Sequence, residues 1–332
     1  MTDPLPTGPP HAAAAPHDLA ALRVVALGGG HGLSASLSAL RHVVSDLTAV
    51  VTVADNGGSS GRLRREFGVL PPGDLRQALA ALCGDDEWGR TWAKVLQHRF
   101  TSHGEMDQHA VGNLLIVALW ELLGEHVNGL DWVARLLGAQ GRVLPMSVTP
   151  IDIAAQVRGA DPDDPAGLST VRGQVEVAST TGQVVSVDLE PTDPPACPEA
   201  LEAVAAADWV VLGPGSWFTS VIPHLMVPEL RHALVRSGAR KVVTLNLEPQ
   251  SGETDGFSPD THLEVLASHA PDLKLDVVLA DVRTVADEGL LRETTASLGA
   301  ELVVADIADP GGAPRHDPVK LANAYAGFIR ET

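Results

Sequence analysis

Cysteine is scarce in this chain: only Cys83 and Cys197 occur among 332 residues, and neither belongs to a C-x-x-C pair. A disulfide framework and a cysteine zinc site are therefore not expected, and a reducing compartment, the cytoplasm, is predicted. The histidines form neither an H-x-H nor an H-E-x-x-H pattern, so they predict no metal site.

Positive charge is also scarce. Lys and Arg number 23 against 42 Asp and Glu, which gives a formal net charge of −19. Such a charge argues against nucleic acid or an anionic membrane as the main partner. No apolar run reaches the roughly 18 residues that a membrane span needs. Residues 1–20 are rich in Pro and Ala and lack the apolar core of a signal peptide, so a disordered tail is predicted there.

One region departs from the acidic composition. Residues 62–99 carry seven Lys or Arg and five Asp or Glu, which is a local charge of +2. A solvated helical face and an anion-binding pocket are both compatible with this excess.

Short apolar segments alternate with helical patterns along most of the chain. This alternation predicts an α/β fold, a Rossmann-like doubly wound and mainly parallel sheet. A single domain over residues 21–331 is expected, with a helical insertion at about residues 74–140. Segments 171–177 and 184–189, separated by Thr181-Gly182, predict a small antiparallel hairpin attached to the main sheet. The apolar segments that read as buried strands are 22–27, 47–54, 209–212, 241–247, 275–281 and 301–306.

The first predicted strand runs into a glycine-rich turn. The sequence from Gly28 to Gly32 is G-G-G-H-G, and a helix with leucines at helical spacing follows it. Strand, glycine-rich turn and helix are typical of a nucleotide-binding βαβ unit, in which phosphate lies at the helix N-terminus. Leu33 interrupts the G-x-G-x-x-G pattern, so a tight turn without a ligand remains an alternative.

The second predicted strand runs into the segment 55–62, with the sequence D-N-G-G-S-S-G-R. In a dinucleotide-binding fold, Asp55 would hold a ribose hydroxyl. The small residues after it fit a second anion-binding nest better. Glycine N–H groups, serine hydroxyls and the Arg62 fork can all donate hydrogen bonds to phosphate oxygens.

Two later strands end in comparable loops. Strand 209–212 leads into Gly213–Ser216. Strand 241–247 leads into a polar loop, whose predicted range of 246–255 includes the last two residues of the strand. Parallel strands end at the same edge of a sheet, so these loops should converge with the first two. Two facing glycine loops suit a ligand with two phosphates. Gly28–Gly32 and Gly213–Ser216 are therefore predicted as the phosphate cradles, with Asp55 and Asn56 facing the sugar or acceptor end.

Several motifs, taken in order, resemble a known family. They are GGGHGLS at 28–34, VTVADNGGSSGRLR at 51–64, PPGD at 71–74, QHRF at 97–100, HAVGN at 109–113, GPGSWFTSVIPH at 213–224 and GETDGF at 252–257. The family is the gluconeogenesis factor family, the YvcK-type group, which is related to the 2-phospho-L-lactate transferases of the CofD type. The resemblance extends over residues 22–330.

The resemblance implies a cytoplasmic protein with a Rossmann-like sheet and a helical insertion. Such proteins bind UDP-activated sugars, notably UDP-N-acetylglucosamine, and are needed for normal cell shape and wall synthesis on gluconeogenic carbon sources. The related transferases move a phospholactyl group from a guanylylated donor to a deazaflavin precursor, with Mg²⁺. The family usually has a second acid where this chain has Asn56, and a glycine where it has Gln108. An asparagine cannot act as a general base and is a weaker ligand for Mg²⁺ than a carboxylate.

Motifs and loops together predict the site. Asp55 is the candidate catalytic residue; no metal or certain cofactor is predicted, and Mg²⁺ would be needed only for transferase chemistry. Asp74 could instead cap a helix, and His109 could be structural. The predicted ligand-binding residues are Gly29, Gly30, His31, Gly32, Asp55, Asn56, Gly57, Gly58, Ser59, Ser60, Arg62, Asp74, His109, Asn113, Gly213, Gly215, Ser216, Thr219, Ser220, Asn246, Glu253 and Thr254.

Three functions remain open. The leading interpretation is a regulatory protein that binds a UDP-sugar or related nucleotide without turnover. The alternative is a transferase that moves a phospholactyl group to a deazaflavin precursor. A nicotinamide-dependent dehydrogenase rests only on the glycine-rich turn and Asp55. A homo-oligomer is also expected.

Overall fold

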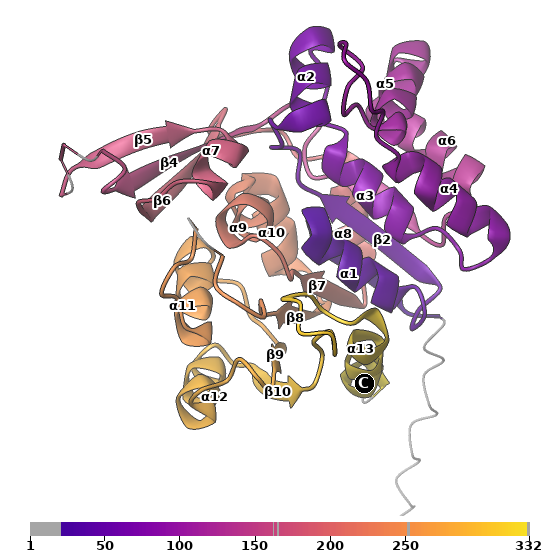
Figure 1. Ribbon diagram of the computed structural model, residues 1–332. Helices are drawn as coiled ribbons and strands as arrows, with labels where there is room; N and C mark the ends of the chain where they lie inside the picture. The colour runs from indigo at the N-terminus through magenta and orange to yellow at the C-terminus, as the bar shows by residue number, and fades with distance from the viewer. Residues whose placement is uncertain (1–20, 162, 165, 251–252, 331–332) are drawn as a thin grey trace, which may run out of the picture.

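The computed structural model describes residues 21–161, 163–164, 166–250 and 253–330 (Figure 1). The tail predicted at residues 1–20 lies outside the described residues. The elements, in order, are β1 (Arg23–Gly28), α1 (Gly30–Leu40), β2 (Asp46–Val51), α2 (Gly58–Phe67), α3 (Gly73–Ala81), α4 (Glu87–Gln97), α5 (Val111–Leu123), α6 (His126–Leu137), β3 (Arg142–Pro145), β4 (Asp152–Arg158), β5 (Leu168–Arg172), α7 (Gln174–Ala178), β6 (Gln183–Glu190), α8 (Pro198–Ala206), β7 (Trp209–Leu212), the π-helical turn η2 (Trp217–Val221), α9 (Ile222–Met226), α10 (Pro228–Arg236), β8 (Arg240–Thr244), α11 (Pro259–His269), β9 (Val277–Asp281), α12 (Glu288–Ser297), β10 (Glu301–Ala305) and α13 (Pro318–Arg330).

The main sheet of the described chain has seven strands in the order β10-β9-β8-β7-β1-β2-β3. Every neighbouring pair is parallel. The predicted Rossmann-like, doubly wound α/β fold is confirmed, and the six predicted strands correspond to β1, β2, β7, β8, β9 and β10. The edge strand β3 was missed because its short sequence, R-V-L-P, ends in a proline, which is uncommon within strands.

The centre of the sheet is apolar on both faces. Leu27 of β1 pairs with Val50 of β2 on one side and with Leu212 of β7 on the other. All three side chains are fully buried. Continuous apolar strands are what a parallel sheet between two helical layers requires. Burial of each such side chain contributes about 1.5–3 kcal/mol to stability.

The strand order reverses between β1 and β7. From β1 the chain moves to β2 and β3, whereas from β7 it moves in the other direction to β8, β9 and β10. Right-handed crossovers therefore put the helices that follow β1 and β7 on opposite faces. Helix α1 packs against α3 and α13, and α8 packs against α10 (Figure 1). Such a reversal opens a crevice beyond the carboxyl ends of β1 and β7.

A separate small sheet projects from the body (Figure 1). Its antiparallel strands have the order β5-β4-β6 within the described chain. The predicted hairpin is thus wrong in its pairing: β5 and β6 both pair with β4, and the sheet is not part of the main one. The segment after Gly173 forms helix α7 because Gly173, at φ 103°, turns the backbone out of the strand. Val177 is buried there while Val175 is exposed.

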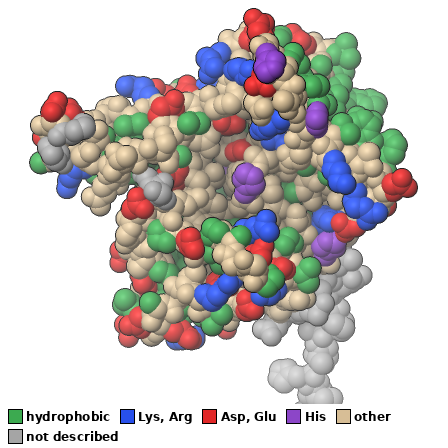
Figure 2. Space-filling view, in the orientation of Figure 1, with side chains coloured by type: hydrophobic (Ala, Val, Ile, Leu, Met, Phe, Trp, Pro, Cys, Tyr) green, Lys and Arg blue, Asp and Glu red, His purple; other side chains and the backbone are tan. Residues whose placement is uncertain are grey.

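The face of the molecule drawn in the space-filling view (Figure 2) carries charged side chains of both signs. On the face shown in Figure 2, Lys and Arg side chains are interspersed with Asp and Glu. No helix within the described part of the chain combines the length and the apolar character needed to cross a bilayer.

Candidate functional site

The two predicted phosphate cradles meet at the crevice between β1 and β7. A Cβ atom on Gly32 would lie 2.3 Å from the carbonyl oxygen of Pro214 and 2.6 Å from Cα of Gly215. Backbones this close tolerate only glycine at position 32. Asn246, after β8, fixes the loop after β7 through Gly215. Its Oδ1 accepts a hydrogen bond from Gly215 N at 2.9 Å, and its Nδ2 donates to Gly215 O at 2.9 Å.

The N-terminus of α1 opens into this junction. The helix begins at Gly30, and its N-cap residue, Gly29, has no side chain that could cap it; a hydrogen bond from the Gly30 N–H lowers the pKa of Asp74, and the next N–H groups, of His31 and Gly32, lie beyond it. The first N–H groups of a helix have no partner within the helix, and the helix dipole places partial positive charge there. The first turn also contains no acidic residue. This end of α1 is therefore suited to an anion such as phosphate.

A cavity of about 460 Å³ lies beside the α1 terminus, and we call it the acidic cavity. Three carboxylates line it: Asp55 after β2, Asp74 in the first turn of α3, and Glu253 after β8. No Lys or Arg is among the described residues of its wall. The other residues of its wall that the sequence predicted as ligand-binding are Gly29, Gly30, His31, Gly32, Gly215, Ser216, Thr219 and Ser220.

Asp55 is held by donors on its own loop. Its Oδ1 accepts a hydrogen bond from Gly57 N at 2.9 Å. Burial raises the pKa of Asp55, while the Gly57 N–H, the Ser60 hydroxyl and the charge of Arg76 oppose that rise. Ser60 in turn accepts a hydrogen bond from Gly73 N at 3.0 Å, which joins the Asp55 loop to the start of α3.

Asp74 is the most strongly perturbed acid of the cavity. Its side chain is buried, and Oδ2 has no hydrogen-bond partner among the described residues. Burial, followed by the nearby charge of Asp55, raises the pKa of Asp74 to about 7. The side chain does not cap α3, whose N-cap is Pro72, so the alternative capping interpretation is not supported. A carboxyl group with a pKa near neutrality can give or accept a proton at physiological pH.

Two further cavities continue from the acidic cavity along the carboxyl edge of the sheet. The junction cavity, about 290 Å³, shares His31, Gly32, Gly215 and Gln250 with the acidic cavity and also contains Arg315. The Phe257 cavity, about 410 Å³, shares the segment 246–249 and Pro314 with the junction cavity. The shared residues place the three cavities next to one another along this edge, and we call the row of cavities the trough.

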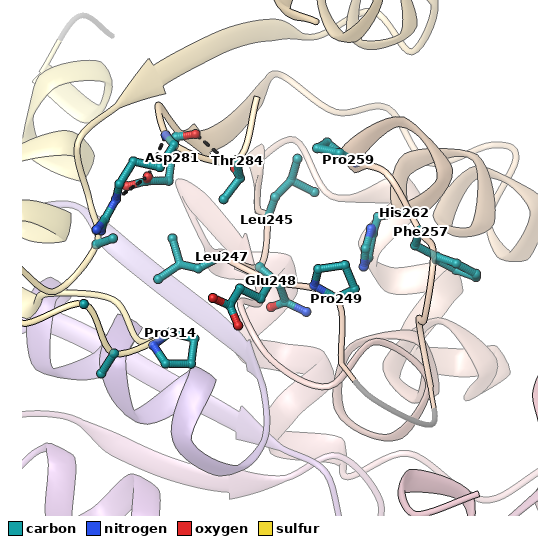
Figure 3. Close-up of a pocket in the computed structure, with 15 residues that line it drawn as sticks. Leu245, Leu247, Glu248, Pro249, Phe257, Pro259, His262, Asp281, Thr284 and Pro314 are labelled. Carbon is teal, nitrogen blue, oxygen red and sulfur yellow. Dashed lines mark hydrogen bonds and ion pairs between the residues drawn. The ribbon is translucent and has the colours of Figure 1, made fainter. Parts of the chain in front are cut away.

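The Phe257 cavity has a mixed wall of apolar and polar side chains. Figure 3 shows Leu247, Pro249 and Pro314 around the space, with Glu248 between the two prolines. Asp281 lies at the far side, where its Oδ1 accepts a hydrogen bond from Arg283 Nε at 3.1 Å. Flat apolar groups with polar edges form the kind of wall that binds a planar heterocyclic ring.

Asn56 faces away from the cavities and towards helix α7. Its Nδ2 donates to Glu176 Oε2 at 2.7 Å, and its Oδ1 accepts from Val175 N at 3.0 Å. Helix α7 supplies Gln174, Val175 and Ala178 to the wall of the acidic cavity. The Asn56 amide group thus ties α7 to the Asp55 loop, while its predicted role towards a ligand stays a prediction.

An Asn56→Asp substitution should loosen this contact. It removes the donor to Glu176 and sets two carboxylates against each other, at a cost of about 1 kcal/mol. We expect faster hydrogen exchange at the α7 amides, with the amides of β1 and β7 unchanged. Adding Glu176→Gln, which restores a donor between the two side chains, should restore slow exchange. Unchanged exchange in the single variant would show that Asn56 does not hold α7.

A second polar network lies behind the Asp55 loop. The Ser59 hydroxyl lies 3.1 Å from His109 Nδ1 and accepts a hydrogen bond from Asn113 Nδ2 at 3.1 Å. Asn113 Oδ1 accepts from Arg76 Nε at 2.8 Å. Burial lowers the pKa of Arg76 to about 10. This network joins α2, α3 and α5 and places a cation behind the two aspartates.

Several predicted ligand residues line none of these three cavities within the described structure. Arg62 donates to the carbonyl oxygens of Glu105 and Asp107, at 3.0 and 2.6 Å, and so orders the loop before α5. The others are Asn56, Gly57, Gly58, Ser59, Ser60, His109, Asn113, Gly213 and Thr254. Asn246 lines the junction and Phe257 cavities.

Comparison with known proteins gives consistent matches. The family model described as 2-phospho-L-lactate transferase CofD matches residues 24–315. A Mycobacterium tuberculosis protein described as "Putative gluconeogenesis factor" is 52% identical over 307 residues, which cover 92% of this chain and 89% of that protein. A gluconeogenesis factor of Listeria innocua is 35% identical over 318 residues, which cover 92% and 95%. The chain belongs to the gluconeogenesis factor family, which is related to the CofD-type transferases.

A solved structure agrees with this assignment. The crystal structure of a UPF0052 family protein from Bacillus halodurans superposes with a TM-score of 0.80 at 33% identity, covering 91% of this chain and 98% of that one. The gluconeogenesis factor family is thus matched in fold as well as in sequence.

Sequence reasoning missed several cavity residues in this member of the family. Gln174 and Val175 reach the site from α7, which lies between β5 and β6 in the sequence and which no strand-end rule could connect with the site. Arg315 lies in the loop after β10, at the same sheet edge as the predicted loops. Extending the strand-end rule to the last strand would have found it.

Proposed function

We propose that the chain is a regulatory protein that binds a UDP-activated sugar, of the UDP-N-acetylglucosamine type, in the cytoplasm. Its proposed role is to support normal cell shape and wall synthesis on gluconeogenic carbon sources. Support for the gluconeogenic link comes from the names of the relatives, which are gluconeogenesis factors. The homo-oligomeric state expected from the sequence stays a prediction.

We infer the class of ligand from the order in which three kinds of binding site lie along the trough. The α1 terminus lines the acidic cavity and the junction cavity, has Arg315 nearby, and is followed along the trough by the Phe257 cavity. Carboxylates accept hydrogen bonds from sugar hydroxyls, a helix N-terminus binds a diphosphate, and an apolar cleft with polar edges binds a base. A nucleotide-sugar has these three parts in the same order.

Calorimetric titration tests this proposal. UDP-N-acetylglucosamine should bind saturably, with a dissociation constant on the order of 10 μM, or about −7 kcal/mol. UDP alone should bind more weakly because it leaves the acidic cavity empty, and free N-acetylglucosamine more weakly still. Absence of binding at millimolar ligand, in protein that is folded by circular dichroism, would exclude the proposal.

A transferase activity is the second candidate, and Asp74 is the observation that favours it. A carboxyl with a pKa of about 7, beside Asp55, could move a proton from an acceptor hydroxyl. Alternatively, the buried Oδ2 of Asp74, which has no hydrogen-bond partner among the described residues, fits a cation, and a carboxylate that held the cation would stay ionised and would not carry the proton. Mg²⁺ is commonly bound by one or two carboxylates together with phosphate oxygens, and Asp55 and Asp74 would be those ligands. When bound, the ion would neutralise phosphate charge.

Mass spectrometry tests the transferase candidate. The protein would be incubated with a guanylylated phospholactyl donor, a deazaflavin precursor and Mg²⁺, with Asp74→Asn as the control. Product in the wild-type reaction and none in the control would support it. Repeated absence of product from protein that still binds nucleotide would count against it.

A further inference from the structure

Glu253 occupies the position in which a phosphate was predicted on the loop after β7. Its Oε2 accepts a hydrogen bond from Phe218 N at 3.2 Å, and its Oε1 from the Thr219 hydroxyl at 2.9 Å. The Ser216 hydroxyl donates to the same Oε1. Backbone N–H groups and hydroxyls converging on one point form a typical anion nest. In this chain a carboxylate from the protein itself fills it.

Glu253 and its described neighbours are built into the fold. The side chains of Glu253 and Thr254 are buried, at 4% and 0% exposure. Thr254 Oγ1 accepts a hydrogen bond from Gln250 N at 2.8 Å, and Gln250 Oε1 accepts from Trp217 N at 3.2 Å. The Phe257 ring packs edge-on against Phe218, with centroids 6.0 Å apart. Glu253 is therefore a fixed part of the cavity wall.

A fixed carboxylate changes which ligand group this wall can accept. It uses the Ser216, Phe218 and Thr219 donors that a phosphate would need. It also adds its charge to that of Asp55, and to that of Asp74 once this group ionises, in a wall whose described residues include no Lys or Arg. Like charges a few ångströms apart repel each other, and they do so more strongly in a partly buried site than in water. An uncharged polyhydroxyl group meets no such barrier.

We propose that Glu253 is a specificity-determining residue, which excludes phosphate from the nest of Ser216, Phe218 and Thr219 and reserves the acidic cavity for the uncharged sugar of the ligand. The sugar assignment rests on the function proposed above; the exclusion of phosphate does not. The diphosphate is thereby directed to the α1 terminus, the other of the two predicted cradles.

Removing the carboxylate should expose the nest to anions. In a Glu253→Ala variant, inorganic phosphate should bind about tenfold or more tightly than in the wild-type protein. Its melting temperature should rise with phosphate concentration, because an anion that binds only the folded state stabilises it. The matched control is Glu264→Ala on α11, which removes an exposed carboxylate that lines none of the three cavities. It should behave like the wild-type protein.

Equal phosphate affinity in the wild-type and Glu253→Ala proteins would overturn the proposal. If the alanine variant does not fold, Glu253→Ser is the second variant, because its short polar side chain leaves the donors of Ser216, Phe218 and Thr219 free. Tighter phosphate binding by that variant would support the proposal, and unchanged binding would overturn it. A wild-type protein that binds no UDP-N-acetylglucosamine would contradict the proposed function while leaving the phosphate comparison intact, so the two failures are distinguishable.

Discussion

An Asp74→Asn variant should be more stable than the wild-type protein above pH 7, by about 2–4 kcal/mol in the free energy of unfolding. The reason is the environment of the carboxyl group. Burial and then the charge of Asp55 raise the pKa of Asp74 from 3.8 to about 7. Ionising this group in the folded protein is therefore costly, and an uncharged amide of the same shape avoids that cost.

The pH dependence gives the sign of the effect. Between about pH 4 and pH 7, the folded protein holds a proton on Asp74 that the unfolded chain has already released. The contribution of Asp74 to the free energy of unfolding of the wild-type protein should therefore fall as the pH rises through that window. Above pH 7 the full cost of ionising Asp74 is present. The difference between variant and wild type should grow over the same window and then level off.

Urea denaturation at a series of pH values would measure this difference. Asp208→Asn is a control of opposite sign, because the N–H groups of Arg23 hold the pKa of Asp208 below its usual value. That substitution should lower stability at pH 7. A loss of stability at pH 8 in Asp74→Asn would show that Asp74 is a satisfied structural group.

The stabilised Asp74→Asn variant should also bind the nucleotide-sugar less tightly, by about tenfold. An amide offers a sugar hydroxyl a weaker acceptor than a carboxylate does, and hydrogen bonds to charged groups are worth about 1.5–3 kcal/mol. A more stable protein with a poorer site is the usual result of relieving strain that a binding site maintains.

A Gly32→Ala substitution should have the second large effect. The added methyl group would meet Pro214 O at 2.3 Å and Gly215 Cα at 2.6 Å, so the α1 turn and the loop after β7 must separate. Overpacking of this kind typically costs 1–3 kcal/mol, and here we expect a loss of about 3 kcal/mol because both contacts are to backbone atoms. Nucleotide-sugar affinity should fall at least about tenfold, since both loops form the junction cavity.

Gly327→Ala is the matched control for this substitution. Gly327 lies in α13, and a Cβ atom there meets nothing within 4 Å. Alanine at an exposed helical position stabilises by up to about 1 kcal/mol relative to glycine. The two variants should therefore move the melting temperature in opposite directions. A Gly32→Ala protein as stable and as active in binding as the wild type would show that the two loops can move apart freely.

Much of the sheet could be predicted because its information is local. The strands that contain Leu27 and Val210 are continuous apolar runs, and such runs occur where helices cover both faces. The rule that parallel strands end at one edge then placed Gly32 beside Gly215 without any knowledge of side-chain contacts. The small sheet was harder, because a single left-handed residue, Gly173, turns an apparently alternating strand into a helix.

The partners of individual side chains could not be predicted. Arg62 is compatible with phosphate by its chemistry, yet carbonyl oxygens 43 and 45 residues away use its N–H groups. Glu253 reads as a polar loop residue, although it fills a nest 34 residues away from it, at Thr219. Sequence patterns show which donors exist, whereas long-range packing decides which acceptor each donor bonds to.

The most direct test of the site is a crystal structure of the protein with UDP-N-acetylglucosamine. The diphosphate should lie at the N-terminus of α1, within hydrogen-bond distance of the backbone N–H groups of His31 and Gly32. The sugar should lie towards Asp55 and Asp74, and the uracil in the Phe257 cavity, with the Glu253 carboxylate still bonded to Phe218 N. A diphosphate seated on Ser216 and Thr219 with Glu253 displaced, or a ligand bound outside the trough, would contradict this arrangement.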